Sequence, residues 1–287
     1  MRTALLSVML VGIGLGCRAS DTPDRTKDAA QLATSLDFAY GVDAARPRTS
    51  FDLHIPPVGD AELYLGEPMG AEADTLGFYG TPVAPETRAA LAKLVQSGNL
   101  LSRSAGLSAT AEGSGFLRIT SGSVKSELSL VAPDEGVNAL RTKLDQILVE
   151  LARHPLRTLR MTLVATREGE TLRPEITLTE VGTEPLSVLF FDPADPSFCL
   201  QATASAGART SELSRGDVAA LVGTHALPAG VTTVPVGAVY HLPLAPLAAI
   251  HKPDGGAVEI SGTVTVWLPG AGASRRGIQL RTRATAP

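Results

Sequence analysis

Residues 133–155 read PDEGVNALRTKLDQILVELARHP, and this segment decides how the rest of the chain is interpreted. Its apolar residues recur every three or four positions, so a helix would place them on one face: Val137, Leu140, Leu144, Ile147, Leu148 and Leu151. Asp134 and Glu135 fall in the first turn, where acidic side chains complement the helix dipole, and Pro155 ends the pattern. The segment predicts an amphipathic helix that covers another layer of structure.

The residues before this helix predict strand pairs and one further helix. Pro85 suits the first position of a helix, and Gly98 is a suitable stop. Strands are predicted by alternation of apolar and polar residues over 50–55 and 61–66, and by further short apolar segments over 115–120 and 126–131. The order of strand pair, helix, strand pair and helix predicts an α+β domain over residues 45–155. In it, two helices would cover one face of an antiparallel sheet.

After Pro155 the pattern changes from helical to strand-like. Strands are predicted over residues 159–163, 176–179, 186–191, 198–203, 219–222, 238–244, 257–268 and 277–283. Short strands separated by Gly- and Pro-containing turns indicate an antiparallel β-sandwich over residues 156–287. In the longest of these strands Gly262 interrupts an apolar face, which predicts a bulge or bend.

Two segments of this second part resemble a known class of module. Residues 175–186, with Glu184-Pro185-Leu186 after a small-residue turn, resemble the strand–turn–strand of immunoglobulin-like modules in bacterial exported proteins. Residues 236–244 are similar to the edge segment of such modules. The resemblance implies an all-β immunoglobulin-like sandwich without the Cys…Trp…Cys core of antibody domains. It implies a fold and leaves the function open.

The first seventeen residues predict export. Arg2 precedes a run of apolar residues over 4–15 that is too short to span a membrane, and Gly16-Cys17 follows. Residues 14–17 resemble the lipobox of bacterial lipoproteins, which implies a signal peptide over 1–16 and a lipid on Cys17. Gly14 departs from the aliphatic residue usual there, so an ordinary signal peptide cut nearby is the alternative.

Residues 17–44 predict a flexible tether between the lipid and the folded part. The segment just after Cys17 is polar and cannot bury apolar area. Arg18 stands where an Asp would resemble an inner-membrane retention signal, so the resemblance favours the outer membrane. Residues 31–40 are mildly apolar and predict a helix or a segment that is ordered by docking.

Composition limits the partners and the redox chemistry. The 287 residues carry a net charge of −4 with no long basic run, which argues against a nucleic-acid partner. Aromatic residues make up 4%, too few for an aromatic-lined sugar or base platform. If Cys17 carries lipid, Cys199 is the one remaining cysteine, no disulfide is possible, and a buried thiol is expected.

No catalytic or cofactor motif is predicted. The histidines are scattered without metal-ligand spacing, although a sheet would be able to bring His225, His241 and His251 together around zinc. Serines beside glycines occur near residues 114 and 121–123, but none forms a nucleophile elbow. Asp192 and Asp195 lie in a turn and lack a full calcium ligand set.

Four arginines near the C-terminal end are a candidate cationic patch for anionic glycans or phosphates, or else a solvated strand face: Arg275, Arg276, Arg281 and Arg283. The sequence therefore predicts a lipid-anchored, non-enzymatic protein of the bacterial cell envelope. It would be held to the membrane by its acyl anchor and would bind another envelope protein, without a cofactor or metal. The alternative is an envelope hydrolase with a site at the domain junction near Pro155.

Overall fold

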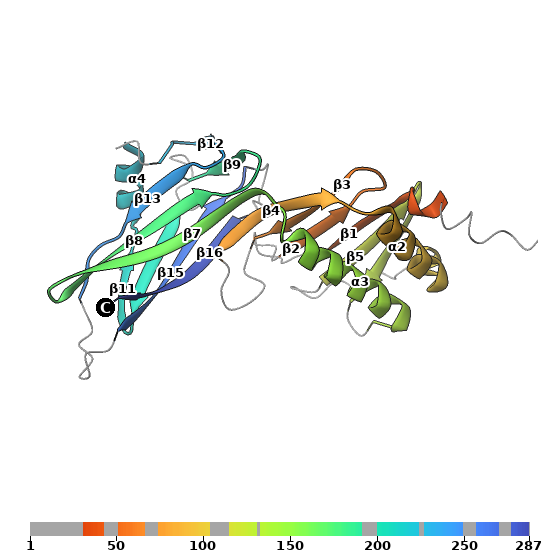
Figure 1. The fold of residues 1–287 in the computed structure, drawn as a ribbon, viewed down its shortest axis with the longest axis horizontal. Coiled ribbons are helices and arrows are strands. Elements are labelled where there is room, and N and C mark those ends of the chain that lie inside the picture. Colours follow the sequence, from red (N-terminus) through yellow and green to blue (C-terminus); the bar gives the residue numbers. More distant parts are fainter. Residues whose placement is uncertain are drawn as a thin grey trace, which may run out of the picture.

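The computed structural model describes residues 31–42, 51–66, 74–103, 115–130, 133–190, 200–223, 227–248, 257–269 and 277–286. These residues form an elongated, β-rich molecule with two antiparallel sheets and few helices (Figure 1). Residues 31–33 are helical, and the helical elements that follow them are α2 (Pro85–Ser97), the short 3₁₀ helix η1 (Leu100–Ser102), α3 (Glu135–Leu151) and α4 (Arg215–Gly223).

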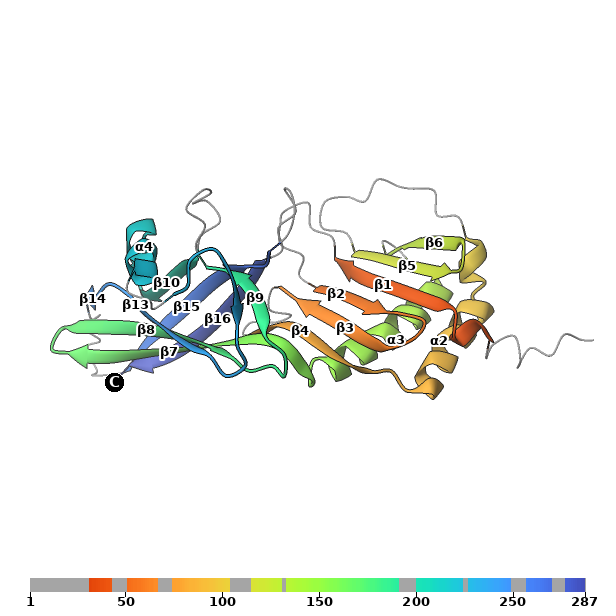
Figure 2. The ribbon, with the colours of Figure 1, turned by 90° about the horizontal axis from the view of Figure 1, so that it is seen from above.

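The ten-stranded sheet runs through the length of the molecule, in the order β13-β8-β7-β4-β3-β2-β1-β5-β6, with β14 beside β8 (Figure 2). Its strands are β1 (Leu36–Val42), β2 (Phe51–Ile55), β3 (Asp60–Leu65), β4 (Thr75–Pro82), β5 (Gly115–Ser121), β6 (Val124–Ser129), β7 (Pro155–Glu168), β8 (Thr171–Glu180), β13 (Val239–Pro243) and β14 (Leu247–Ala248).

The six-stranded sheet belongs to the C-terminal part of the chain, in the order β11-β10-β15-β9-β12, with β16 on β15. Its strands are β9 (Leu186–Leu189), β10 (Gln201–Ala206), β11 (Arg209–Glu212), β12 (Val231–Val234), β15 (Val258–Trp267) and β16 (Gly277–Ala286).

The helices α2 and α3 lie together beside the N-terminal strands of the ten-stranded sheet (Figures 1 and 2). All six apolar residues of the predicted stripe in α3 are buried, which confirms the amphipathic helix. Asp134 caps this helix, because its side chain accepts a hydrogen bond from the backbone N–H of Val137 at 3.0 Å. Between the layers, the Tyr40 hydroxyl of β1 donates to Asp145 of α3 at 2.7 Å, and burial raises the pKa of Tyr40 to about 12.

The predicted strands of the N-terminal part are confirmed, and two strands, β1 and β4, were not predicted. The strands β2 and β3 form the expected hairpin, and β5 pairs with β6. Residues 36–42, which the sequence placed at the end of the tether, form β1 between β2 and β5. Leu36, Phe38 and Tyr40 alternate with less buried residues and are each at most 3% exposed. The two-residue period of these side chains therefore decides for a strand over residues 36–42. Residues 31–33 are helical, as one of the two alternatives predicted for 31–40.

The strand β7 connects the two parts of the molecule. It begins at Pro155, pairs with β4 over its first residues and with β8 over most of its length. The boundary predicted after residue 155 therefore lies inside one continuous sheet. Farther along, β7 and β8 face the six-stranded sheet: a Cβ at Gly262 would lie 3.2 Å from Leu163 and 3.5 Å from Ile176.

Two predictions for the C-terminal part are wrong. Residues 219–222 were expected to form a strand and belong to helix α4. Helix α4 starts after Ser214 because Ser214 and Asp217 form a reciprocal cap. The Asp217 carboxylate accepts a hydrogen bond from the Ser214 N–H at 2.9 Å, and the Ser214 hydroxyl accepts one from the Asp217 N–H at 3.2 Å. At Gly262 the register of β15 is continuous with both neighbours, so the glycine makes room for the facing sheet and does not mark a bulge.

Glycines let backbones approach closely where β7 begins. A Cβ at Gly77, whose φ is +136°, would lie 2.4 Å from the carbonyl oxygen of Arg157, and one at Gly182 would lie 2.0 Å from that of Leu156. Glu180, 1% exposed, accepts from the backbone N–H groups of Thr158 and Gly182. These contacts fix the start of β7 against both β4 and the turn after β8.

Thr158 offers a test of this packing. Its side-chain oxygen is buried and has no hydrogen-bond partner among the described residues. A buried hydroxyl without a partner costs free energy, so the isosteric change Thr158→Val is expected to raise the free energy of unfolding by about 1 kcal/mol. Urea denaturation measures the change, and a loss of stability would show that the hydroxyl does have a partner.

Candidate functional site

The outer face of the six-stranded sheet, which points away from the ten-stranded sheet, is polar along three strands. In β15, Ser261, Thr263 and Thr265 lie on this face, whereas Ile260 and Val264 point inward and are fully buried. The same alternation in β10 buries Ala202 and Ala204. Because side chains alternate between faces along a strand, every second residue contributes to a continuous polar surface.

Strand register arranges these side chains in rows. Residues directly opposite each other on paired strands lie on the same face, with strands about 4.8 Å apart and neighbouring rows about 6.7 Å apart. The rows across β10, β15 and β16 are Gln201–Thr265–Gln279, Thr203–Thr263–Arg281 and Ser205–Ser261–Arg283. In the last row, the hydroxyls of Ser205 and Ser261 are 2.9 Å apart.

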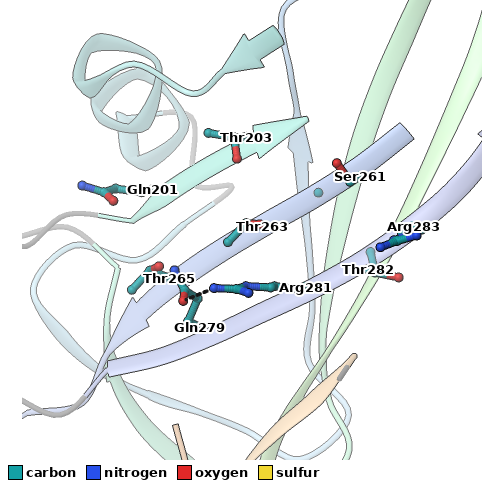
Figure 3. A pocket seen from close by; sticks show the side chains of 10 residues that line it. Gln201, Thr203, Ser261, Thr263, Thr265, Gln279, Arg281, Thr282 and Arg283 are labelled. Atoms are coloured by element: carbon teal, nitrogen blue, oxygen red, sulfur yellow. Dashed lines mark hydrogen bonds between the residues drawn. The ribbon is translucent and has the colours of Figure 1, made fainter. Parts of the chain in front are cut away.

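This surface is hollowed into a cavity of about 460 Å³ (Figure 3). Its volume lies within the range of about 300–1,000 Å³ typical of small-molecule sites. Thr265 and Gln279 are 2% and 8% exposed, so they lie deepest among the labelled side chains. The described lining residues are Gln201, Thr203, Ser261, Gly262, Thr263, Thr265, Gln279, Arg281, Thr282 and Arg283.

The two arginines of this surface differ in their partners. Arg283 forms an ion pair with Glu259 at 3.0 Å, which offsets its charge. Arg281 donates to the side-chain oxygen of Gln279 at 3.0 Å, and no ion pair joins it to a carboxylate in the part of the chain that the structure describes. A neutral amide holds the guanidinium in place without offsetting its charge. The positive charge of the cavity is therefore concentrated at Arg281.

A second hollow, of about 340 Å³, lies between the start of α2 and the end of α3. Among its lining residues, Glu150 and His154 form a pair at 3.5 Å. Ile147 and Leu151 contribute apolar surface. The described residues that line it include no serine or cysteine. This hollow is close in sequence to the junction at Pro155, but it lacks the strongest nucleophiles that a hydrolase of the expected kind would use.

The histidines that the structure describes do not come together. His54 pairs with Asp37 at 3.0 Å, and His241 pairs with Glu175 at 2.7 Å on the β8–β13 ladder. Across the described ranges, no group of three or more His, Cys, Asp or Glu side chains is placed to hold a metal ion. The zinc hypothesis therefore gains no support from His241.

The serines beside glycines lie at a turn. Ser121 ends β5, with its hydroxyl 2.9 Å from that of Ser35, and Gly122 has a φ of +58°. This is the turn chemistry expected from the sequence, since a positive φ favours glycine. The other candidate residues lie outside the described residues: Cys17, Ser114, Asp192, Asp195, Cys199, His225, His251, Arg275 and Arg276.

Sequence reasoning found Arg281 and Arg283 but missed the polar rows around them. Thr263 and Thr265 were placed on the face opposite the apolar residues of β15, and nothing in the sequence paired that face with Gln201 or Gln279. The information missing from the sequence was the register between neighbouring strands. Only the pairing of β10, β15 and β16 shows that amides, hydroxyls and guanidinium groups lie side by side.

A scan against protein-family models found no matching family, and searches of curated proteins and of solved structures found no match. No helix of the described residues is long and apolar enough to cross a membrane.

Proposed function

We propose that this protein is a non-enzymatic binding protein of the bacterial cell envelope, with its binding surface on the outer face of the six-stranded sheet. The observation that carries the proposal is the polar cavity that holds Arg281. A concave surface with convergent polar groups and a charge that no described carboxylate offsets is suited to bind a complementary ligand.

The composition of the cavity favours binding over catalysis. General acid–base or nucleophilic chemistry uses a histidine, carboxylate, thiol or activated hydroxyl within hydrogen-bond reach of a partner. The ten described lining residues include no histidine, aspartate, glutamate or cysteine. Its hydroxyl groups stand beside amides, which donate and accept hydrogen bonds, and guanidinium groups, which only donate them. Neither group takes up a proton at neutral pH.

The proposed architecture is an N-terminal α+β domain joined to an immunoglobulin-like sandwich. In support, two helices lie beside the N-terminal strands, and two antiparallel sheets face each other in the C-terminal part. In an immunoglobulin-like module, binding surfaces are sheet faces, edges and end loops, so a polar sheet face fits this arrangement.

The proposed anchor is a lipid on Cys17, followed by a polar tether that ends before β1. Such an anchor would keep the binding surface at the outer membrane and raise its local concentration there. The change Cys17→Ser is expected to abolish labelling of the protein by a fatty-acid probe in cells. Unchanged labelling would refute the anchor and leave the binding surface untouched.

Binding itself is tested by capture from envelope extract. Residues 20–287 retain every described element and are immobilised as bait. We expect retained material to fall at least about tenfold with Arg281→Glu, because that change reverses the charge of the cavity. Arg173→Glu is the matched control, since Arg173 lies on β8 outside the cavity and pairs with Glu168. Equal retention by wild type and Arg281→Glu would overturn the proposed surface.

A further inference from the structure

Arg281 presents hydrogen-bond donors to the cavity in a fixed direction. A guanidinium has five N–H donors in one plane, and the described partner of Arg281 is the single oxygen of Gln279. Thr263, directly opposite on β15, and Thr203 on β10 continue the row (Figure 3). A ligand group that lies over this row therefore meets the guanidinium and hydroxyl groups at the same time.

The charge balance of the face favours a carboxylate as the group that Arg281 binds. A guanidinium fork matches the two oxygens of a carboxylate, and one positive charge matches one negative charge. Glu212 ends the same row on β11, opposite Thr203, and Glu259 lies beyond Ser261 on β15. These carboxylates would repel a doubly charged phosphate more than a singly charged carboxylate.

The uncharged part of the surface favours a saccharide over a peptide. Threonine, serine and glutamine side chains both donate and accept hydrogen bonds, as sugar hydroxyls do. A bound peptide places its side chains in apolar pockets, and the described lining of this cavity includes no apolar side chain. Because no aromatic ring lines the cavity, polar contacts would carry recognition.

We infer that the outer face of the six-stranded sheet binds an acidic polysaccharide, with a sugar carboxylate on Arg281 and sugar hydroxyls on the rows of Thr203, Thr263, Thr265 and Gln279. This inference rests on the proposed function and specifies the ligand of the same surface. Bidentate pairing would set the position of the acidic ring. The amide and hydroxyl rows would select neighbouring rings by their hydrogen-bonding pattern.

The test is calorimetric titration of residues 20–287 with hexamers of galacturonic, glucuronic and mannuronic acid. We expect at least one hexamer to bind, and its methyl ester to bind at least about tenfold more weakly, because esterification removes the charge. Arg281→Gln should weaken binding of the acid about ten- to hundredfold, and Arg281→Lys less, because lysine keeps the charge without the fork. Arg173→Gln is the matched control and should change affinity less than about threefold, since Arg173 lies outside the cavity and pairs with Glu168.

Each contrary outcome has a defined meaning. Equal binding of the ester, or no effect of Arg281→Gln, overturns the carboxylate contact. Equally tight binding of hexaglutamate or of inorganic phosphate overturns the inference that the ligand is a saccharide. If no hexamer binds while Arg281→Glu still reduces capture from envelope extract, the ligand class is wrong and the proposed function stands. If neither assay responds to Arg281, both are wrong.

Discussion

The change Gly182→Ala is expected to lower the free energy of unfolding by about 3 kcal/mol or more. A Cβ at this position would lie 2.0 Å from the carbonyl oxygen and 2.4 Å from the carbonyl carbon of Leu156. These atoms belong to the backbone of β7, so no side-chain rotation relieves the overlap. The same carbonyl accepts from the Glu184 N–H at 2.8 Å, and moving it would weaken this hydrogen bond as well.

Urea denaturation of the wild-type and variant proteins measures this loss. Gly136→Ala is the matched control, because Gly136 lies in α3 and its Cβ would meet no atom closer than 3.4 Å. In a helix alanine is favoured over glycine by about 0.5–1 kcal/mol, so the control should be neutral or stabilising. A loss below about 1 kcal/mol for Gly182→Ala would show that β7 can move away from this turn.

The second large effect is expected at Glu180. Its buried carboxylate accepts from three backbone N–H groups: those of Thr158 at 3.3 Å, Gly182 at 2.9 Å and Gly237 at 3.3 Å. The change Glu180→Ala removes the side-chain acceptor of the Thr158 and Gly182 N–H groups, whereas the Gly237 N–H also donates to the Glu180 backbone carbonyl at 3.2 Å. A buried donor without a partner costs about 1–3 kcal/mol. We therefore expect a loss of about 3 kcal/mol, shown by a lower urea midpoint.

Two further variants separate the effect of losing the hydrogen-bond acceptor from the effect of losing the negative charge. Glu180→Gln keeps the shape and one acceptor oxygen and should lose less than Glu180→Ala. Glu184→Ala removes an exposed carboxylate 3.7 Å from Arg157 and should cost less than about 1 kcal/mol. If Glu180→Ala costs no more than Glu184→Ala, the buried hydrogen bonds do not hold this junction.

The contacts at the start of β7 matter for the candidate site because β7 packs against the sheet that carries this site. The start of β7 is fixed by Gly182 and Glu180, and the same strand carries Leu163 across to the six-stranded sheet. There Leu163 packs near Gly262, in the middle of the strand whose other face carries Thr263. A shift of β7 would therefore displace β15, which carries part of the lining of the polar cavity.

The sequence predicted elements whose own residues carry the full pattern. Helix α3 has an acidic first turn, a six-residue apolar stripe and a terminal proline, so its prediction needed no tertiary information. The side chains of β1 alternate as clearly between its two faces, but β1 follows a polar segment, so the sequence indicated a tether. Among the side chains of helix α4 that the structure describes, Val218 alone is fully buried, and the start of the helix depends on the Ser214–Asp217 cap.

The candidate site was less predictable because it depends on register. Arg281 is separated from Thr203 by 78 positions in the chain, and the pairings of β16 with β15 and of β15 with β10 place them in one row. Strand patterns predict which residues share a face of one strand, but not which strands are neighbours.

The most direct measurement is the nuclear magnetic resonance of arginine side chains during titration with the uronic acid hexamer that binds best. We expect the side-chain Nε–H signal of Arg281, assigned through Arg281→Lys, to shift progressively to saturation, while the signal of Arg173 stays in place. A saturable change of other arginine signals that leaves the Arg281 signal in place would contradict a binding surface on the six-stranded sheet.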